Sequence, residues 1–292
     1  MKLKYQVPQD FLHEEVRRDY TITAEMKQVW AVQLDLLQEL IRVCKENGLR
    51  VFADSGTLIG AVRENGFIPW DDDIDVAMPR EDYDRLMSLS AEFRDPYFLQ
   101  TITTHEYYIN RFAQLHMKGT TAMRRDSHQR HQQCIYIDIF VLDSVPTTPR
   151  AFKRHYNKVK SVRLKLKLAM KLRDRIPHSW YRYIRSHVNC LSDKYWFGKF
   201  EAVMRSVRHD DRTPYAAYLC QRMTLPIVPL TCYDQTVWMP FEHIQVPVPA
   251  GYDEVLRLQY GDYMKPVKAP TQHGQMIFRV PSLLQHPESE GL

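Results

Sequence analysis

A run of acidic residues at positions 71–75 carries the most informative chemistry in the chain. Within this run Asp73 and Asp75 alternate with apolar residues, the period of a β-strand, so both carboxylates are predicted to point to one face. Like charges this close repel unless a cation lies among them, and Mg²⁺ prefers carboxylate oxygens. We therefore predict a metal site at Asp73 and Asp75. Asp71 and Asp72 are further candidates, as ligands or as supports of the ligands. The alternative is a solvated acidic turn or a structural Ca²⁺ loop.

A turn of small residues, Asp54-Ser55-Gly56-Thr57, precedes the acidic run. Such turns present backbone N–H groups to phosphate. We predict that Ser55, Gly56 and Thr57 bind the phosphates of a donor substrate, Thr57 also through its hydroxyl. Arg63 follows about two helical turns later and is a candidate for neutralising a phosphate. A tight turn without a ligand and an exposed helical arginine are the alternatives.

A third carboxylate, Asp138, lies within an apolar stretch at 135–141. A buried carboxylate needs a partner, so Asp138 is predicted to join Asp73 and Asp75 on a neighbouring strand. Three such carboxylates can hold two cations about 3.5–4 Å apart, the spacing used for in-line displacement at phosphorus. Asp138 is also placed to draw the proton from an attacking hydroxyl. The alternative is a hydrogen-bonded structural aspartate.

The order of these blocks resembles a known family. A Gly-Ser/Thr turn followed by Asp-x-Asp is the plan of nucleotidyltransferase-fold enzymes. The stretch FADSGTLIGAVR at 52–63, followed by GFIPW at 66–70 and the acidic run, closely resembles the LicD family, and the resemblance continues at 137–143 and 256–264. This family comprises bacterial phosphocholine transferases, with fukutin and its relatives as eukaryotic cousins.

The resemblance implies a Mg²⁺-dependent phosphotransferase, with two Mg²⁺ ions expected and Mn²⁺ as an alternative. The donor would be CDP-choline, and the acceptor a sugar hydroxyl of a cell-surface glycan such as a lipopolysaccharide, teichoic acid or capsule precursor. The hydroxyl would attack the phosphorus that bears the alcohol and expel CMP. Nucleic acid is not expected as a partner.

Three further residues are weaker candidates. His273 follows the Tyr260-Gly261-Asp262-Tyr263 segment, where LicD-like proteins also tend to carry a histidine. Trp70 adjoins the acidic run and could contact a choline headgroup through a cation–π interaction, although most aromatic residues are core residues. Lys118 is a candidate phosphate ligand in a predicted loop.

Two other functions stay open. The first is transfer of another CDP-linked alcohol phosphate, such as ribitol or glycerol phosphate, or true nucleotidyl transfer. The second, from a different class, is a non-catalytic protein of this fold that binds nucleic acid or a membrane surface.

The elements that must position these residues follow from periodicity and turn signals. Apolar spacing predicts an amphipathic helix over 24–47 that ends at Gly48. A strand at 49–53 leads into the turn, a short helix covers 57–64, and a helix covers 80–89 after the acidic strand. Further strands are expected at 97–103, 111–117 and 135–141. The fold class is therefore α/β (α+β), a nucleotidyltransferase-like mixed sheet flanked by helices.

A basic stretch follows this core between residues 153 and 185. Its length and composition favour a helix that ends at Pro177, followed by helices at 180–190 and 193–207. A loop-rich return then contains one strand near 237–246 and a short helix at 252–259. We predict a catalytic core at 1–146, a basic helical insertion at 147–222, and a returning segment at 223–292 whose tail is disordered from about 285.

The basic stretch has two interpretations, an ordinary solvated face or peripheral contact with an anionic membrane. In the second, the interleaved Val162, Leu166, Ala169 and Met170 are predicted to give a shallow apolar contact.

Composition restricts the protein class. The 292 residues are 44% hydrophobic with a net charge of +5, enough for one large domain. We expect no transmembrane helix and no signal peptide, since no long apolar run exists. Five cysteines without metal-site spacing indicate reduced thiols. The expected location is the cytoplasm, peripheral to the inner face of the membrane if the basic stretch binds lipid.

Overall fold

The structure is a computed structural model. It describes residues 2–106, 108–124, 133–207, 215–217, 227–267 and 276–281. The helices are α1 (Ala24–Glu46), α2 (Ser55–Arg63), α3 (Arg80–Ser88), α4 (Pro149–Arg175), α5 (His178–His187), α6 (Asp193–Met204) and α7 (Tyr252–Tyr260). Short 3₁₀ turns are η1 (Gln9–Leu12), η2 (Ser90–Glu92), η3 (Asn189–Leu191) and η4 (Leu230–Tyr233).

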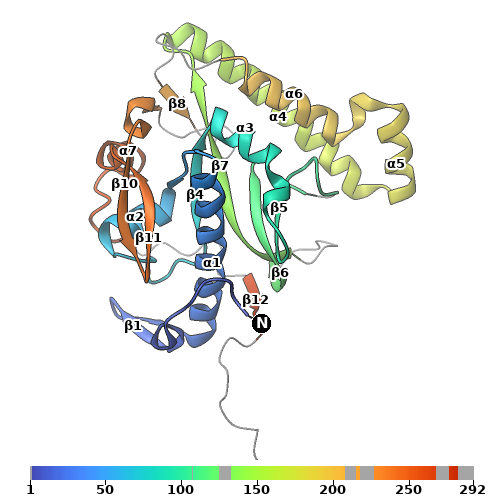
Figure 1. The fold of residues 1–292 in the computed structure, drawn as a ribbon. Coiled ribbons are helices and arrows are strands. Elements are labelled where there is room, and N and C mark those ends of the chain that lie inside the picture. The colour runs from blue at the N-terminus through green and yellow to red at the C-terminus, as the bar shows by residue number, and fades with distance from the viewer. Residues whose placement is uncertain are drawn as a thin grey trace, which may run out of the picture.

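A mixed sheet forms the centre of the molecule (Figure 1). Its strands are β3 (Phe52–Ala53), β4 (Asp75–Pro79), β5 (Tyr97–Gln100), β6 (Ala113–Arg124), β7 (Gln133–Val145), β8 (Tyr215–Ala217), β9 (Val228–Pro229) and β12 (Met276–Arg279). The main order is β12-β6-β7-β4-β3, with β5 paired to β6, and β8 paired to both β7 and β9. Only β4 and β7 run parallel among these described pairs. The predicted fold class is confirmed.

Helix α1 packs against β6 and β7 and supplies much of the core. It begins where the Thr23 hydroxyl accepts a hydrogen bond from the Met26 N–H. It ends at Glu46, and Gly48, whose φ of +62° suits glycine, follows the C-cap Asn47. Burial of residues such as Leu34, Leu37 and Leu40 confirms the predicted amphipathic helix. Two of its buried side chains, Trp30 and Gln33, donate hydrogen bonds to the backbone of the acidic run.

Several predicted boundaries differ from the structure. The strand expected at 49–53 is confined to Phe52–Ala53, although Leu49 and Val51 are buried. The strand expected near 237–246 is a hairpin of two, β10 (Thr236–Phe241) and β11 (Ile244–Pro249). The predicted alternation of the acidic run is wrong at Asp73, because β4 begins only at Asp75. Residues 71–74 lie outside any strand. The carbonyl groups of residues 71 and 72 accept hydrogen bonds from side chains of α1 instead of from a neighbouring strand.

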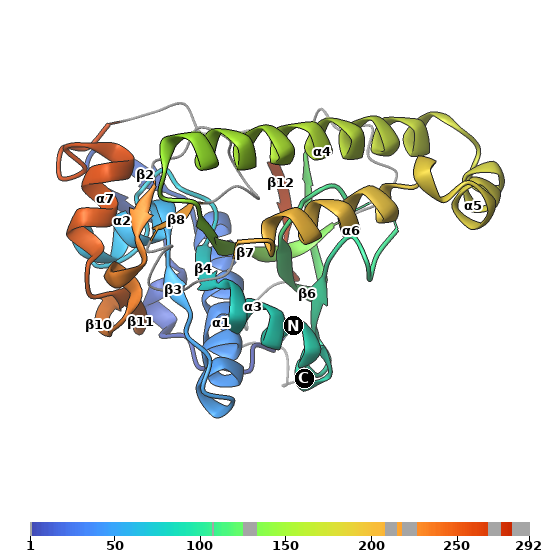
Figure 2. The same cartoon turned by 90° about the horizontal axis from the view of Figure 1, so that it is seen from above.

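A helical arm, α4 to α6, projects beyond the sheet (Figures 1 and 2). Helices α4 and α6 pack side by side, and α5 lies at the far end. Pro149 occupies the first turn of α4, where the Thr148 hydroxyl accepts from the Ala151 N–H. The predicted basic helix is confirmed, as are the two helices after it.

The C-terminal segment returns to the core. The β10–β11 hairpin packs on β3 and α2, and β12 pairs with β6. A small N-terminal hairpin, β1 (Glu15–Arg17) and β2 (Tyr20–Ile22), completes the described elements. Within the described ranges, no helix combines the length and apolar composition needed to cross a bilayer. The predicted tail from about 285 lies outside the described residues.

Candidate active site

Asp75 and Asp138 lie side by side on the two parallel strands of the sheet. Asp75 is the first residue of β4, and its register partner on β7 is Asp138, so both side chains share one face. The Asp75 N–H donates to the Thr57 hydroxyl over 2.9 Å, and the Asp75 carbonyl accepts from the Asp54 N–H over 3.0 Å. These bonds fix the start of β4 against the N-terminus of α2.

The acidic run before β4 is held in place through its backbone. The Trp30 indole donates to the Asp71 carbonyl over 3.1 Å, and the Gln33 amide donates to the Asp72 carbonyl over 2.8 Å. The Ile74 carbonyl accepts from the Asp138 N–H over 2.9 Å. The carboxylates at 71, 72 and 73 each offer one oxygen within 4.8 Å of the other two. The acidic run is thus a loop with a fixed backbone whose carboxylates lie close together.

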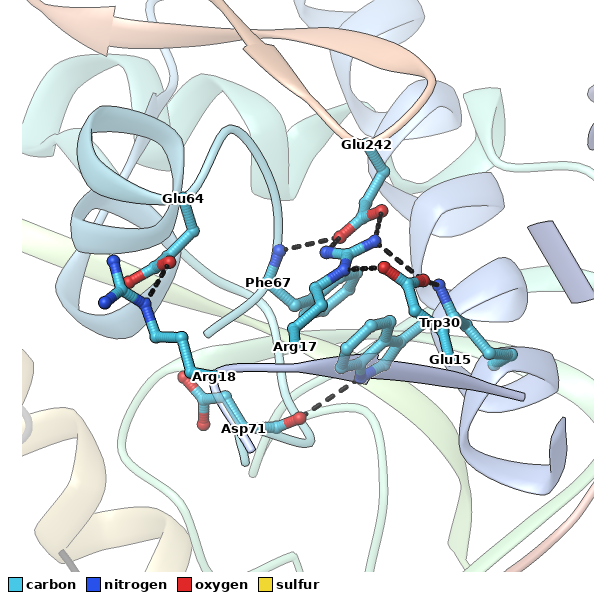
Figure 3. A network of polar contacts seen from close by, with 9 residues as sticks. Glu15, Arg17, Arg18, Trp30, Glu64, Phe67, Asp71 and Glu242 are labelled. Atoms are coloured by element: carbon cyan, nitrogen blue, oxygen red, sulfur yellow. Dashed lines mark hydrogen bonds and ion pairs between the residues drawn. The ribbon is translucent and has the colours of Figure 1, made fainter. Parts of the chain in front are cut away.

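A network of charged residues steadies the segment that leads into this loop (Figure 3). Arg17 donates two bonds to Glu242, of 2.6 and 2.7 Å, and Glu242 accepts the Phe67 N–H over 3.0 Å. The Phe67 ring stacks on Trp30 with centroids 4.3 Å apart. The β1–β2 and β10–β11 hairpins therefore stabilise the segment that precedes Asp71.

Four other carboxylates lie close enough to Asp75 to affect its ionisation. The pKa of Asp75 is raised well above its usual value, first by burial and then by Asp73, Asp138, Asp54 and Asp71. Asp54, at the N-cap of α2, was not among the acids assigned to the metal site from the sequence. Such an oxygen-only set fits a hard divalent cation such as Mg²⁺, which would relieve the repulsion.

The Gly56 turn lies directly against this cluster. A Cβ at Gly56 would come within 2.4 Å of Asp71 Oδ2, so only glycine allows the carboxylate this position. Ser55 has a φ of +48° and donates through its hydroxyl to Asp54 over 3.2 Å. The buried Thr57 oxygen accepts the Asp75 N–H, so this hydroxyl anchors β4. The turn and the acids are therefore one site.

The remaining predicted residues lie elsewhere or in other roles. Arg63 is buried and donates to Glu64 and to the Tyr263 carbonyl, each over 2.6 Å, which ties α2 to the chain after α7. Lys118 is exposed on β6 and pairs with Asp95, outside the cluster. Trp70 is half-buried and meets Tyr20 edge-on, with centroids 6.3 Å apart. His273 lies outside the described residues.

Comparison with known proteins places this site in a family. Residues 48–161 match the family model described as LicD/FKTN/FKRP, nucleotidyltransferase domain. The lipopolysaccharide cholinephosphotransferase LicD of Haemophilus influenzae is 27% identical over 266 residues, which cover 82% of this chain and 91% of that protein. Residues 48–161 are therefore a LicD-family nucleotidyltransferase domain.

Two shorter similarities fall to uncharacterised proteins of Rickettsia. The protein of Rickettsia prowazekii is 36% identical over 58 residues, and that of Rickettsia typhi 34% over 59 residues. Each match covers 20% of this chain, and 22% and 19% of the respective relatives. The Gly56 turn, the acidic loop and Asp138 all lie inside the segment matched by the LicD family model.

The structure adds residues that the sequence reasoning missed. Gln114 on β6 is the register partner of Asp138, and its Nε2 donates to Asp138 Oδ1 over 2.7 Å. His116 follows two residues later and approaches Gln114 Oε1 at 3.2 Å. Tyr136 shares the same face, and its pKa is raised by burial and then by Asp138 and other acids of the candidate site. Gln114 and His116 are polar residues that alternate with apolar ones, which was the available signal.

Proposed function

We propose that this protein transfers phosphocholine from CDP-choline to a hydroxyl of lipopolysaccharide or a related cell-surface glycan. The pairing of Asp75 with Asp138 beside the Gly56 turn carries the proposal, because it supplies a carboxylate site next to a helix N-terminus. The choice of phosphocholine and lipopolysaccharide is supported by the Haemophilus relative, which is similar over most of both chains.

Asp73, Asp75 and Asp138 would hold Mg²⁺, with Asp54 and Asp71 alongside. When bound, the metal would neutralise the diphosphate of the donor and stabilise charge on the leaving group. Backbone hydrogen bonds fix both ends of the acidic loop, so the carboxylates that would bind the metal are held in place before β4.

The N-terminus of α2 is the proposed binding site of the donor phosphates. The first N–H groups of an α-helix have no partner within the helix, and the helix dipole favours an anion there. Helix α2 begins at Ser55, and Gly56 brings its backbone against the acidic cluster. The donor diphosphate would thus lie between these N–H groups and the carboxylates.

Asp138 is the proposed general base. Its Oδ1 is held by Gln114, so the orientation of the whole carboxylate is fixed. In the reaction, the acceptor oxygen forms a bond to the phosphorus that bears choline, the bond from that phosphorus to CMP breaks, and the hydroxyl proton passes to Asp138. Choline keeps its own phosphate, and CMP leaves with the electron pair.

Trp70 is the proposed contact for the quaternary ammonium. It directly precedes the acidic loop, and Tyr20 meets it edge-on. A trimethylammonium group has no N–H to donate, so it binds best over aromatic faces. A Trp70→Leu variant is expected to weaken binding of CDP-choline more than binding of CDP-glycerol, measured by isothermal titration.

The purified protein should be incubated with CDP-choline, CDP-ribitol, CDP-glycerol or CTP, with a glycan acceptor and Mg²⁺, and assayed for CMP and pyrophosphate. We expect CMP from CDP-choline, loss of activity with EDTA, and recovery on adding Mg²⁺. Asp75→Asn should be inactive, whereas Asp95→Asn, an exposed carboxylate paired with Lys118, should be active. CMP from another CDP-alcohol only, or pyrophosphate from CTP, would reject the proposed donor.

A further inference from the structure

The helical arm has an inner and an outer face on its longest helix. The inner face of α4 packs against α6 and the core, and Val159, Leu166 and Ala169 are buried there. Arg173 is also buried and donates to Asp193 over 2.8 Å. The contact predicted from the interleaved Val162, Leu166, Ala169 and Met170 is therefore wrong, because these residues serve the packing of the arm.

The opposite side of α4, here called the α4 outer face, is both basic and apolar. Its residues recur at intervals of three and four and are all exposed; they are Lys160, Leu164, Lys167, Leu168, Lys171 and Arg175. Leu164 is 59% exposed and Leu168 57% exposed, in the middle of the charged row. Two exposed leucines flanked by cations are not explained by packing within the chain.

Negative charge is nearly absent from α4. Its single acidic residue is Asp174, which accepts from the Arg173 Nε over 2.9 Å. Among the described residues, no carboxylate forms an ion pair with Lys160, Lys167 or Lys171. The positive charge of the face is thus available to an external anionic partner.

The end of the arm adds exposed aromatic residues. Trp180 is 67% exposed and Tyr183 60% exposed on α5, which lies beyond the C-terminal end of α4 in both views (Figures 1 and 2). Val188 and Leu191 continue this exposed apolar character. Trp and Tyr are the residue types that settle at the boundary between lipid and water.

We infer that the α4 outer face docks on an anionic lipid bilayer. A basic helix face with embedded aliphatic side chains lies in the headgroup region, where cations meet lipid phosphates and leucines reach the acyl boundary. Nucleic acid would satisfy the cations but would leave Leu164 and Leu168 in water. The inference does not rest on the transferase activity, because lipid binding is measured without donor or acceptor.

The test is sedimentation of the full-length protein with phosphatidylglycerol–phosphatidylcholine vesicles and with pure phosphatidylcholine vesicles. A variant with Lys160→Gln, Lys167→Gln and Lys171→Gln is compared with a control carrying Lys2→Gln, Lys45→Gln and Lys265→Gln, three exposed lysines outside α4. Each basic residue near an anionic surface strengthens partitioning about fivefold, so the α4 variant should bind roughly 100-fold more weakly. The control should bind like the wild type.

A second variant, Leu164→Gln with Leu168→Gln, tests the apolar part. It should reduce the binding that survives raised salt, because salt screens the charges and not the apolar contact. Both variants change only exposed residues, so their circular dichroism should match the wild type. Equal binding to neutral vesicles, equal weakening by the control, or binding to single-stranded RNA without binding to vesicles would each overturn the inference.

Discussion

Gln114 and Asp138 face each other across β6 and β7, and the glutamine amide donates to the carboxylate over 2.7 Å. Because Nε2 is used on Asp138, the other end of the amide is the acceptor Oε1. His116 Nε2, 3.2 Å from that oxygen, must then carry a proton. A buried histidine therefore orients the glutamine, and the glutamine orients the carboxylate proposed as general base.

Gln114→Leu should lower the turnover number while leaving the fold intact. The substitution removes the bond that holds Asp138, and loss of such supporting bonds costs about 10–100-fold in activity or metal affinity. Gln100→Leu is the matched control, since Gln100 is the register partner of Gln114 on β5, one strand further from Asp138. Steady-state kinetics across a Mg²⁺ titration would measure both. Equal turnover in the two variants would show that Gln114 does not position the base.

Asp75→Asn should raise the melting temperature of the metal-free protein. The pKa of Asp75 is raised by burial and by its acidic neighbours, so its ionised form opposes folding without a cation. Differential scanning fluorimetry with EDTA and with Mg²⁺ would measure this. The wild type should gain stability from Mg²⁺, and Asp75→Asn should gain little. The same Mg²⁺-induced shift in both proteins would exclude Asp75 as a ligand.

Gly56→Ala should impair the reaction more than it destabilises the protein. The added Cβ meets Asp71 Oδ2 at 2.4 Å and must push that carboxylate away. A displacement of about 1 Å at a reacting site can cost about 100-fold in rate. Gly198→Ala on α6 is the control, because nothing lies within 4 Å of its added Cβ. Normal activity in both variants would show that the Gly56 turn is not part of the active site.

His116 should make the protein sensitive to acid. Burial lowers the pKa of His116 to about 3 from the ordinary 6.5. Between these pH values His116 is protonated in the unfolded chain and neutral in the folded protein. The free energy of unfolding therefore falls as the pH drops below 6.5, by up to about 1.4 kcal/mol per pH unit. His116→Phe should fill the space between Phe98 and Tyr136 and flatten this dependence. Urea unfolding from pH 7 to pH 4 measures the slope, and parallel slopes would contradict the expectation.

The sequence was sufficient to predict part of the arrangement at the candidate site. Apolar neighbours placed Asp75 and Asp138 on strands, and the need of a buried carboxylate for a partner predicted that the two strands adjoin; the structure makes the two residues register partners. The helix over 24–47 followed from its period and its terminal glycine. These are local signals, so they can be read without knowledge of tertiary contacts.

Features that depend on distant partners were not predictable in the same way. Asp73 lies in a loop because Trp30 and Gln33 hold the backbone beside it. Arg63 is directed to Tyr263, 200 residues further along the chain. Which leucines of α4 are buried depends on where α6 packs, and neither Gln114 nor His116 could be assigned to Asp138 without the strand register.

The measurement that tests the central claim most directly is the mass of the acceptor after reaction. Purified protein would be incubated with CDP-choline carrying deuterated choline, Mg²⁺ and lipopolysaccharide, and the glycan would be analysed by mass spectrometry. We predict that the glycan gains labelled phosphocholine and that CMP is released in equal amount, with neither change in Asp75→Asn. Addition of a cytidylyl group to the glycan, or an unchanged glycan with every CDP-alcohol tested, would contradict the proposed phosphotransfer.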